Sequence, residues 1–165
     1  MANVCFNIIS VSGNRESLER LREKVRRGSE PFCFDAIVPM PPLLNHIIED
    51  RDAYERLGKV TDKTHHWVRF DGHEIVERRQ LSEFELRLLD RIEPKTADWW
   101  CVTHWGCKWE VEDVDTSEND DGIHYDFYTP WEPPVGVVKA LRAQFPDLKI
   151  DASYEIQEDE VEGQY

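Results

Sequence analysis

The sequence predicts an α+β fold in which an antiparallel sheet carries two helices on one face. Three observations predict it. Strand-forming segments lie near both ends of the chain, at 4–12 and, with alternating apolar residues, at 150–156. An amphipathic helical segment follows the first of these strands, another precedes the last, and a hairpin lies between the helices. The order strand, helix, strand, helical insertion, strand, strand, helix, strand is the split βαβ arrangement, so we expect a single ferredoxin-like domain over 1–165.

The N-terminal elements are recognised by the spacing of their apolar residues, which becomes helical after the first strand. Residues 4–12 mix β-branched and aromatic side chains, which predicts the first strand. The first helix is indicated by three apolar residues at helical spacing: Leu18, Leu21 and Val25. Residues 32–38 alternate again and end at a run of prolines, so we expect a short second strand there.

Residues 43–95 are interpreted as an insertion that is mostly helical. Its clearest part is 81–92, where Ser82 and Glu85 form a capping box. This helix is expected to bury one stripe of apolar side chains: Leu81, Phe84, Leu88 and Ile92.

The C-terminal elements are a hairpin, a helix and a strand. Residues 99–112 are aromatic and β-prone, 115–122 form an acidic turn, and 123–128 alternate. A helix over 135–145 begins and ends next to prolines. After the last strand, residues 157–165 form an acidic tail that we expect to be frayed.

Composition favours a folded cytoplasmic protein. The chain has 165 residues, of which 40% are hydrophobic and 33% charged, as in globular domains. Residues 1–14 lack a basic segment followed by an apolar run, and no segment approaches the about 18 apolar residues of a membrane span. Without a secretory signal, the four cysteines are typical of reduced thiols, and we expect a cytoplasmic location and no membrane partner.

The net charge of −14 is concentrated in the C-terminal part of the chain. Residues 1–92 contain 16 acidic and 15 basic residues, whereas 93–165 contain 18 acidic and 5 basic residues. The simplest role of such charge is solubility. It also repels phosphates and attracts basic protein surfaces, so nucleic acid is a disfavoured partner.

Five segments resemble the YubB ferredoxin-like family, which is found on bacteriophages, prophages and plasmids. They are MANVCFNIISVSG, FCFDAIVPMPP, HWGCKWE, YTPWEPP and AQFPDLKIDASYEI, and together they cover 1–42 and 99–156. The resemblance implies a ferredoxin-like fold and a mobile-element origin, in a family of unknown function. The chain departs from the family pattern at His104 and Cys107, where Asn and Thr are expected, and at 157–160, where a glycine-rich ending is expected.

Cysteine and histidine residues supply the candidate metal ligands. Cys101, His104 and Cys107 are spaced three apart, and His124 could complete a tetrahedral set. Structural zinc sites, however, show two paired ligand clusters. In an extended segment, residue 104 would also point away from residues 101 and 107. We therefore expect buried thiols, with no metal and no cofactor.

Two further patterns are incomplete. A cysteine with His124 and Asp126 would supply the residue types for acyl transfer, but nothing in the sequence fixes their contact. The acidic turn matches four places of a calcium-binding loop: Ser117, Asn119, Asp121 and Gly122. Tyr128 stands where a bidentate glutamate is required, so the turn is interpreted as a solvated hairpin tip.

Aromatic residues are concentrated in the same part of the chain. Five of the six tryptophans fall between residues 99 and 131. Burial in a core accounts for most such rings, but Trp and Tyr are also favoured as interface anchors. The partner-binding residues that we predict here are Trp105, Gly106, Lys108, Trp109, Tyr128 and Trp131.

The sequence therefore favours a non-enzymatic interaction module that binds a host or mobile-element protein through these aromatic residues and the acidic C-terminal half. One version is an acidic inhibitor that occupies a nucleic-acid-binding host protein by mimicking phosphates. Two alternatives stay open. One is single-stranded nucleic-acid binding on the open sheet face, where rings can stack on bases. The other is a metal-binding protein or Cys/His enzyme.

Overall fold

The computed structural model describes residues 4–119, 122–156 and 161–165, and the chain divides into two compact units. Unit 1 consists of Met1–Pro39 and Cys101–Tyr165, and unit 2 is Met40–Trp100. Unit 2 thus contains the whole of the insertion expected at 43–95, and unit 1 contains the two parts of the chain on either side of it.

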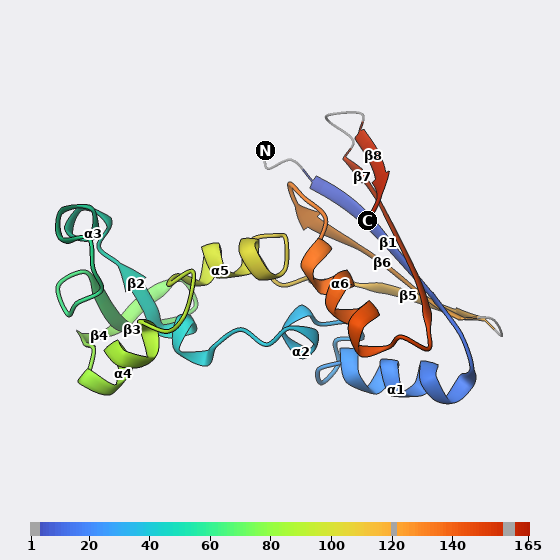
Figure 1. The fold of residues 1–165 in the computed structure, drawn as a ribbon, viewed down its shortest axis with the longest axis horizontal. Coiled ribbons are helices and arrows are strands. Elements are labelled where there is room, and N and C mark those ends of the chain that lie inside the picture. The colour runs from blue at the N-terminus through green and yellow to red at the C-terminus, as the bar shows by residue number, and fades with distance from the viewer. Residues whose placement is uncertain (1–3, 120–121, 157–160) are drawn as a thin grey trace. The chain divides into compact units, whose positions relative to one another are not determined.

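Unit 1 contains a single sheet within its described residues. Its strands run in the order β5-β6-β1-β7-β8, and every neighbouring pair is antiparallel. Helices α1 and α6 cover the same face (Figure 1). The predicted ferredoxin-like α+β fold is therefore confirmed. The bounds are β1 (Val4–Ser12), α1 (Arg15–Val25), α2 (Phe34–Ile37), β5 (Asp115–Asn119), β6 (Gly122–Pro130), α6 (Val135–Gln144), β7 (Lys149–Ile156) and β8 (Val161–Gln164), with α5 (Ala97–His104) spanning the boundary between the units.

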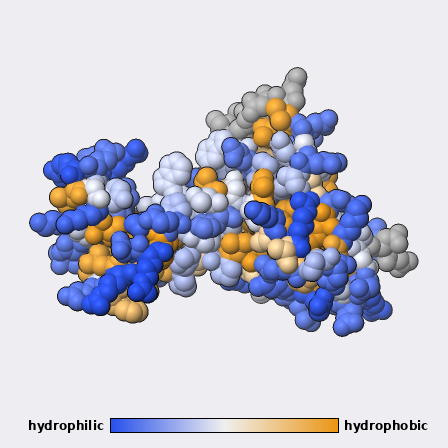
Figure 2. Space-filling model, in the orientation of Figure 1, coloured by the Kyte–Doolittle hydropathy of each residue, from blue (hydrophilic) through white to orange (hydrophobic). Residues whose placement is uncertain are grey.

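The core of unit 1 lies between the sheet and these helices. Along β1 every second residue from Cys5 to Val11 is buried, as expected of a strand with one face against a core. Helix α1 begins at the cap Asn14, whose side chain accepts a hydrogen bond from the N–H of Ser17 at 3.0 Å. Its predicted apolar stripe is buried, and hydrophilic side chains cover its outer side (Figure 2). The buried helical side chains are Leu18, Leu21 and Val25 of α1 and Val137, Val138 and Leu141 of α6.

The strand expected at 32–38 is instead the short helix α2. The carboxylate of Glu110 accepts hydrogen bonds from the N–H groups of Phe34 and Asp35 at 2.6 and 2.8 Å, which satisfies the first donors of a helix. The strand prediction failed because the apolar residues at 32–34 face the core from a loop and a helix, and not from a pleated strand.

Strand β5 forms the edge of the sheet and pairs with β6. Its residues were predicted to be part of the acidic turn. Every residue of β5 is exposed, so this edge strand has no apolar alternation for the sequence to reveal. The aromatic segment predicted as a strand over 99–112 contains helix α5 up to His104. Residues 120 and 121, at the tip of the predicted turn, lie outside the described residues.

The sequence predicts a frayed tail over 157–165, but residues 161–165 are ordered against the sheet. Strand β8 pairs with β7, and the hydroxyl of Tyr165 donates to Oδ1 of the buried Asn7 at 3.0 Å. Arg142 donates to the carbonyl oxygen of Tyr165 at 2.7 Å. Residues 157–160 of the predicted tail lie outside the described residues.

Unit 2 is not mostly helical, which corrects the prediction for the insertion. Its described residues contain an antiparallel sheet in the order β2-β3-β4 beside short helices. The polar hairpin β3–β4 turns at Gly72, whose φ is +58°, and all residues of β4 are exposed, so again no alternation marks the strand. The bounds are η1 (Pro42–His46), β2 (Ile47–Glu49), α3 (Arg51–Leu57), β3 (His65–Asp71), β4 (Glu74–Gln80) and α4 (Glu83–Leu89).

Helix α4 confirms one prediction and corrects another. The capping box of Ser82 and Glu85 is present at its first turn. The predicted apolar stripe is right at Leu81, which is buried, but wrong at Phe84 and Leu88, which are 69% and 37% exposed. The buried residue of the helix itself is Leu89. Periodicity located the helix here without identifying which of its apolar side chains face the core.

Candidate functional site

Two of the six predicted binding residues belong to the core of unit 1. Trp105 is 3% exposed, and its Nε1 donates to the carbonyl oxygen of Val38 at 2.8 Å. Gly106 has φ +99°, and a Cβ there would lie 2.8 Å from the carbonyl oxygen of Pro133. Only glycine fits this approach between the loop after α5 and the start of α6. We therefore assign Trp105 and Gly106 to packing and not to a binding surface.

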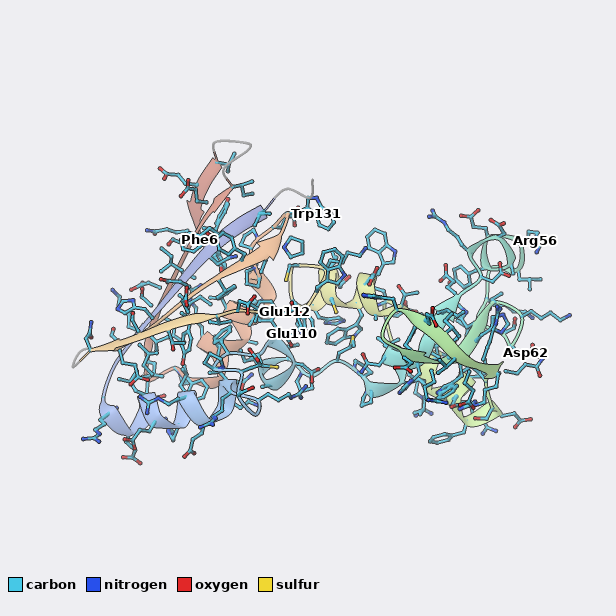
Figure 3. All side chains as sticks on the ribbon, turned by 180° about the vertical axis from the view of Figure 1, so that it is seen from behind. Phe6, Arg56, Asp62, Glu110, Glu112 and Trp131 are labelled. Atoms are coloured by element: carbon cyan, nitrogen blue, oxygen red, sulfur yellow. The ribbon has the colours of Figure 1, made fainter. Side chains whose placement is uncertain are left out.

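Three of the others form a group at the surface that we call the indole cluster: the half-buried Lys108 and the exposed Trp109 and Trp131. The Trp109 and Trp131 side chains are 50% and 44% exposed, and their ring centroids lie 5.8 Å apart with the planes inclined at 45°. Nζ of Lys108 lies 5.1 Å from the ring centroid of Trp109, within cation–π distance. Trp131 lies at the end of β6 (Figure 3).

Trp131 projects from a strained turn. Its φ is +64°, and the N–H of Glu132 donates to the carbonyl oxygen of Pro130 at 2.8 Å, which closes a γ-turn around it. The Thr129 hydroxyl donates to the carbonyl oxygen of Glu132 at 2.8 Å, and Nδ2 of Asn7 donates to that hydroxyl at 2.8 Å. Asn7 and Thr129 are buried, so the core holds the turn in place.

The sheet face opposite α1 and α6 carries the sixth residue, Tyr128, and we call this face the open face. Phe6 on β1 lies directly opposite Tyr128 on β6, and their ring centroids are 5.0 Å apart. The side chain of Tyr128 is 58% exposed. Beside the rings is a hollow of about 470 Å³ lined by residues of β1, β7 and β8. Phe6 was not predicted, because only the strand register shows that it pairs with Tyr128.

Carboxylates flank these rings on both sides. Asp115 lies opposite Asp126 across β5 and β6, and Glu155 lies opposite Glu162 across β7 and β8. We call these four residues the acidic pairs. Like charges directly opposite each other destabilise a sheet. Within the described residues none of the four takes part in an ion pair. The sequence did not identify them, because register again decides which charges face each other.

The charge of the open face argues against nucleic acid. Aromatic rings on the neighbouring strands β1 and β6 are an arrangement that can stack on bases. Lys149, the basic residue of β7 on this face, is paired with Asp151 at 2.8 Å and leaves the acidic pairs uncompensated. Phosphates brought to this face would meet a negative surface, so the geometry suits a cationic ligand better.

The predicted metal candidates do not form a ligand set. Cys101 and Cys107 are buried, whereas Nδ1 of His124 lies 2.9 Å from Oγ of Ser10 on the open face. Burial raises the pKa of Cys107 to about 12, so this thiol stays protonated. In the ranges that the structure describes, no three histidine, cysteine or acidic side chains, His104 included, are grouped to hold a metal ion.

The structure also does not bring together the residues of the Cys–His–Asp pattern or form the calcium-binding loop in its described part. His124 and Asp126 share the open face, whereas all four cysteines are buried, and Cys5 on β1 points to the helix-covered face. Of the calcium-loop positions, Ser117 and Asn119 lie on β5, and Asp121 is outside the described residues. Over the described ranges, no helix combines the length and apolar character needed to span a membrane.

Comparison with known proteins supports the fold. Residues 104–164 match the family described as a ferredoxin-like domain in Api92-like protein. The crystal structure of protein Api92 from Yersinia pseudotuberculosis is similar over 99% of this chain and 93% of that chain, with a TM-score of 0.53 and 10% sequence identity. At this identity the likeness concerns the fold alone. No curated protein matches the sequence.

These matches confirm the ferredoxin-like fold that the sequence resemblance implied, but they do not confirm the YubB family itself. The matched descriptions name an Api92-like protein and a fold, and neither names an activity, ligand or partner. Function must therefore be argued from the surfaces of the chain.

Proposed function

We propose that this chain is a non-enzymatic protein-binding module whose open face takes up a basic segment of a partner protein. The observation that carries the proposal is the placement of the acidic pairs on either side of Phe6 and Tyr128. Both pairs are repulsive in the free chain, so a cationic ligand gains free energy by relieving them. Lysine and arginine side chains also bind the faces of exposed aromatic rings.

The partner best suited to this face is a host or mobile-element protein with a phosphate-binding surface. Carboxylates spaced along a sheet can occupy lysine and arginine side chains that otherwise contact a nucleic-acid backbone. In this form the chain inhibits a nucleic-acid-binding protein without catalysis. The buried, protonated Cys107 supports a role that does not depend on thiolate chemistry.

A double substitution, Phe6→Ala with Tyr128→Ala, is expected to weaken binding of a basic peptide about tenfold or more, because it removes the aromatic surface between the acidic pairs. The probe is a labelled peptide of alternating arginine and alanine, titrated by fluorescence anisotropy at low and at physiological salt. Trp99→Ala, which removes an exposed indole of unit 2, is the matched control. Binding of labelled oligo(dT) in preference to the peptide would overturn the proposal in favour of nucleic acid.

The same variants identify the partner. The tagged chain should enrich basic proteins from a bacterial lysate, and the double variant should lose them while Trp99→Ala retains them. Equal capture by all three proteins would show that the open face is not the binding surface.

Asp126→Asn is expected to raise the free energy of unfolding by about 0.5 kcal/mol, because it removes the repulsion with Asp115. The same change should weaken binding of the basic peptide. Urea denaturation and peptide titration measure the two effects. Glu23→Gln removes an exposed charge of α1, outside the sheet, and should leave both quantities unchanged. A loss of stability in Asp126→Asn would contradict the idea that this carboxylate is kept for binding.

A further inference from the structure

The indole cluster has the features of a second binding surface. Trp109 and Trp131 expose about half of their side chains side by side, and neither indole N–H donates a hydrogen bond within the described part of the chain. An indole N–H that becomes covered on binding needs an acceptor. A ligand for this cluster must therefore bring apolar surface and free carbonyl groups together.

The position of the cluster restricts the class of ligand. Trp109 lies in the loop between α5 and β5, and Trp131 follows the end of β6. Neither belongs to a strand edge, so a ligand gains no ladder of backbone hydrogen bonds there. A polyproline II segment needs no such ladder, because its backbone is solvated and its carbonyls are free to accept. Its proline rings also pack on the faces of aromatic side chains.

We propose that the indole cluster binds a proline-rich segment that also carries a basic residue. The two indole faces receive the proline rings, and the indole N–H groups donate to ligand carbonyls. The charge of the ligand is set by two exposed carboxylates that adjoin the cluster in sequence, Glu112 and Glu132. These attract an arginine or lysine next to the prolines.

The backbone of Trp131 points to binding and not to stability. A positive φ is unfavourable for a residue with a bulky side chain, and glycine would adopt it freely. Strained residues of this kind cluster at ligand clamps, where the surrounding structure fixes them. The buried Asn7 and Thr129 fix this turn, so the indole is already ordered before the ligand arrives.

The test is a titration of the full chain with two synthetic peptides. One has two arginines followed by a run of prolines, and the other has two arginines followed by alternating glycine and serine. The proline peptide should bind about tenfold tighter or more and shift the indole N–H resonances of Trp109 and Trp131. Trp131→Gly should reduce its binding about tenfold without lowering the thermal midpoint, since glycine removes the strain. Trp99→Ala should bind like the unmodified chain.

Equal affinity for the two peptides, or unchanged binding by Trp131→Gly, would overturn the proposal. So would a thermal midpoint that falls by several degrees in Trp131→Gly, because the indole would then be a structural residue. The variant with Phe6→Ala and Tyr128→Ala leaves the cluster intact and should still bind the proline peptide. Loss of that binding would place the peptide on the open face and overturn the assignment to the cluster.

Discussion

Replacing Glu110 with alanine is expected to lower the free energy of unfolding of unit 1 by about 3 kcal/mol. Its carboxylate accepts hydrogen bonds from the N–H groups of Phe34, Asp35 and Val111 at 2.6, 2.8 and 3.0 Å. Phe34 is completely buried, so its N–H would lose its acceptor in a place with no replacement. An unsatisfied buried donor costs about 1–3 kcal/mol, and hydrogen bonds to a charged acceptor are roughly twice as strong as neutral ones.

The Cys33 thiol adds a fourth donor to Glu110, at 3.3 Å. Burial, and then the nearby Glu110 carboxylate, raise the pKa of Cys33, so the thiol keeps the proton that it donates. Glu110→Gln retains one acceptor oxygen and should cost about half as much as Glu110→Ala. Glu112, labelled beside Glu110 in Figure 3, is exposed and serves as the control. Urea denaturation measures all three variants, and equal midpoints for Glu110→Ala and Glu112→Ala would show that the four contacts contribute nothing.

The position of Glu110 explains why this part of the fold was not predictable. The residue stabilises a helix about which the local sequence says nothing, across a separation of 76 residues from Phe34. The local sequence at 32–38 does not contain this carboxylate, and its alternation alone led to the incorrect prediction of a strand. Helix α1 shows the opposite case. Its apolar stripe is encoded within the helix, and the structure confirms it.

The candidate sites show the same division between local and long-range information. Composition and aromatic content directed the prediction to this part of the chain, and Trp109, Tyr128 and Trp131 are exposed there. The sequence could not separate them from the buried Trp105, because both kinds of tryptophan carry the same local pattern. Likewise, alternation along β1 places Phe6 and Cys5 on opposite faces without showing which face the helices cover. Strand register and helix placement decide that, and both arise from tertiary packing.

A fall in pH is expected to destabilise unit 2 by about 3 kcal/mol through His65 alone. This side chain is fully buried, and its Nδ1 lies 3.0 Å from Oγ1 of Thr64. Burial, and then the positive charges of Lys95 and His66, lower the pKa of His65 from 6.5 to about 4. This holds even though Oε2 of Glu49 lies 3.5 Å from Nε2 of His65.

The sign of the effect follows from the two protonation states. The unfolded chain binds a proton at this histidine near pH 6.5, whereas the folded chain binds it only near pH 4. Between these values the unfolded state holds more protons, so stability rises with pH across the interval. The contribution of His65 is therefore complete above about pH 6.5 and is lost as the pH falls toward 4.

Hydrogen exchange of residues 40–100, corrected for intrinsic rates and followed from about pH 7 to about pH 4.5, measures this loss where it occurs. His65→Gln cannot take up the proton and should show a smaller fall in protection over the same interval. His73→Gln, at an exposed position of the same unit, should behave like the unmodified chain. Because all three proteins contain the same carboxylates, the difference between the unmodified chain and His65→Gln reports on the imidazole. Equal pH dependence in these two proteins would mean that the buried site does not keep His65 neutral.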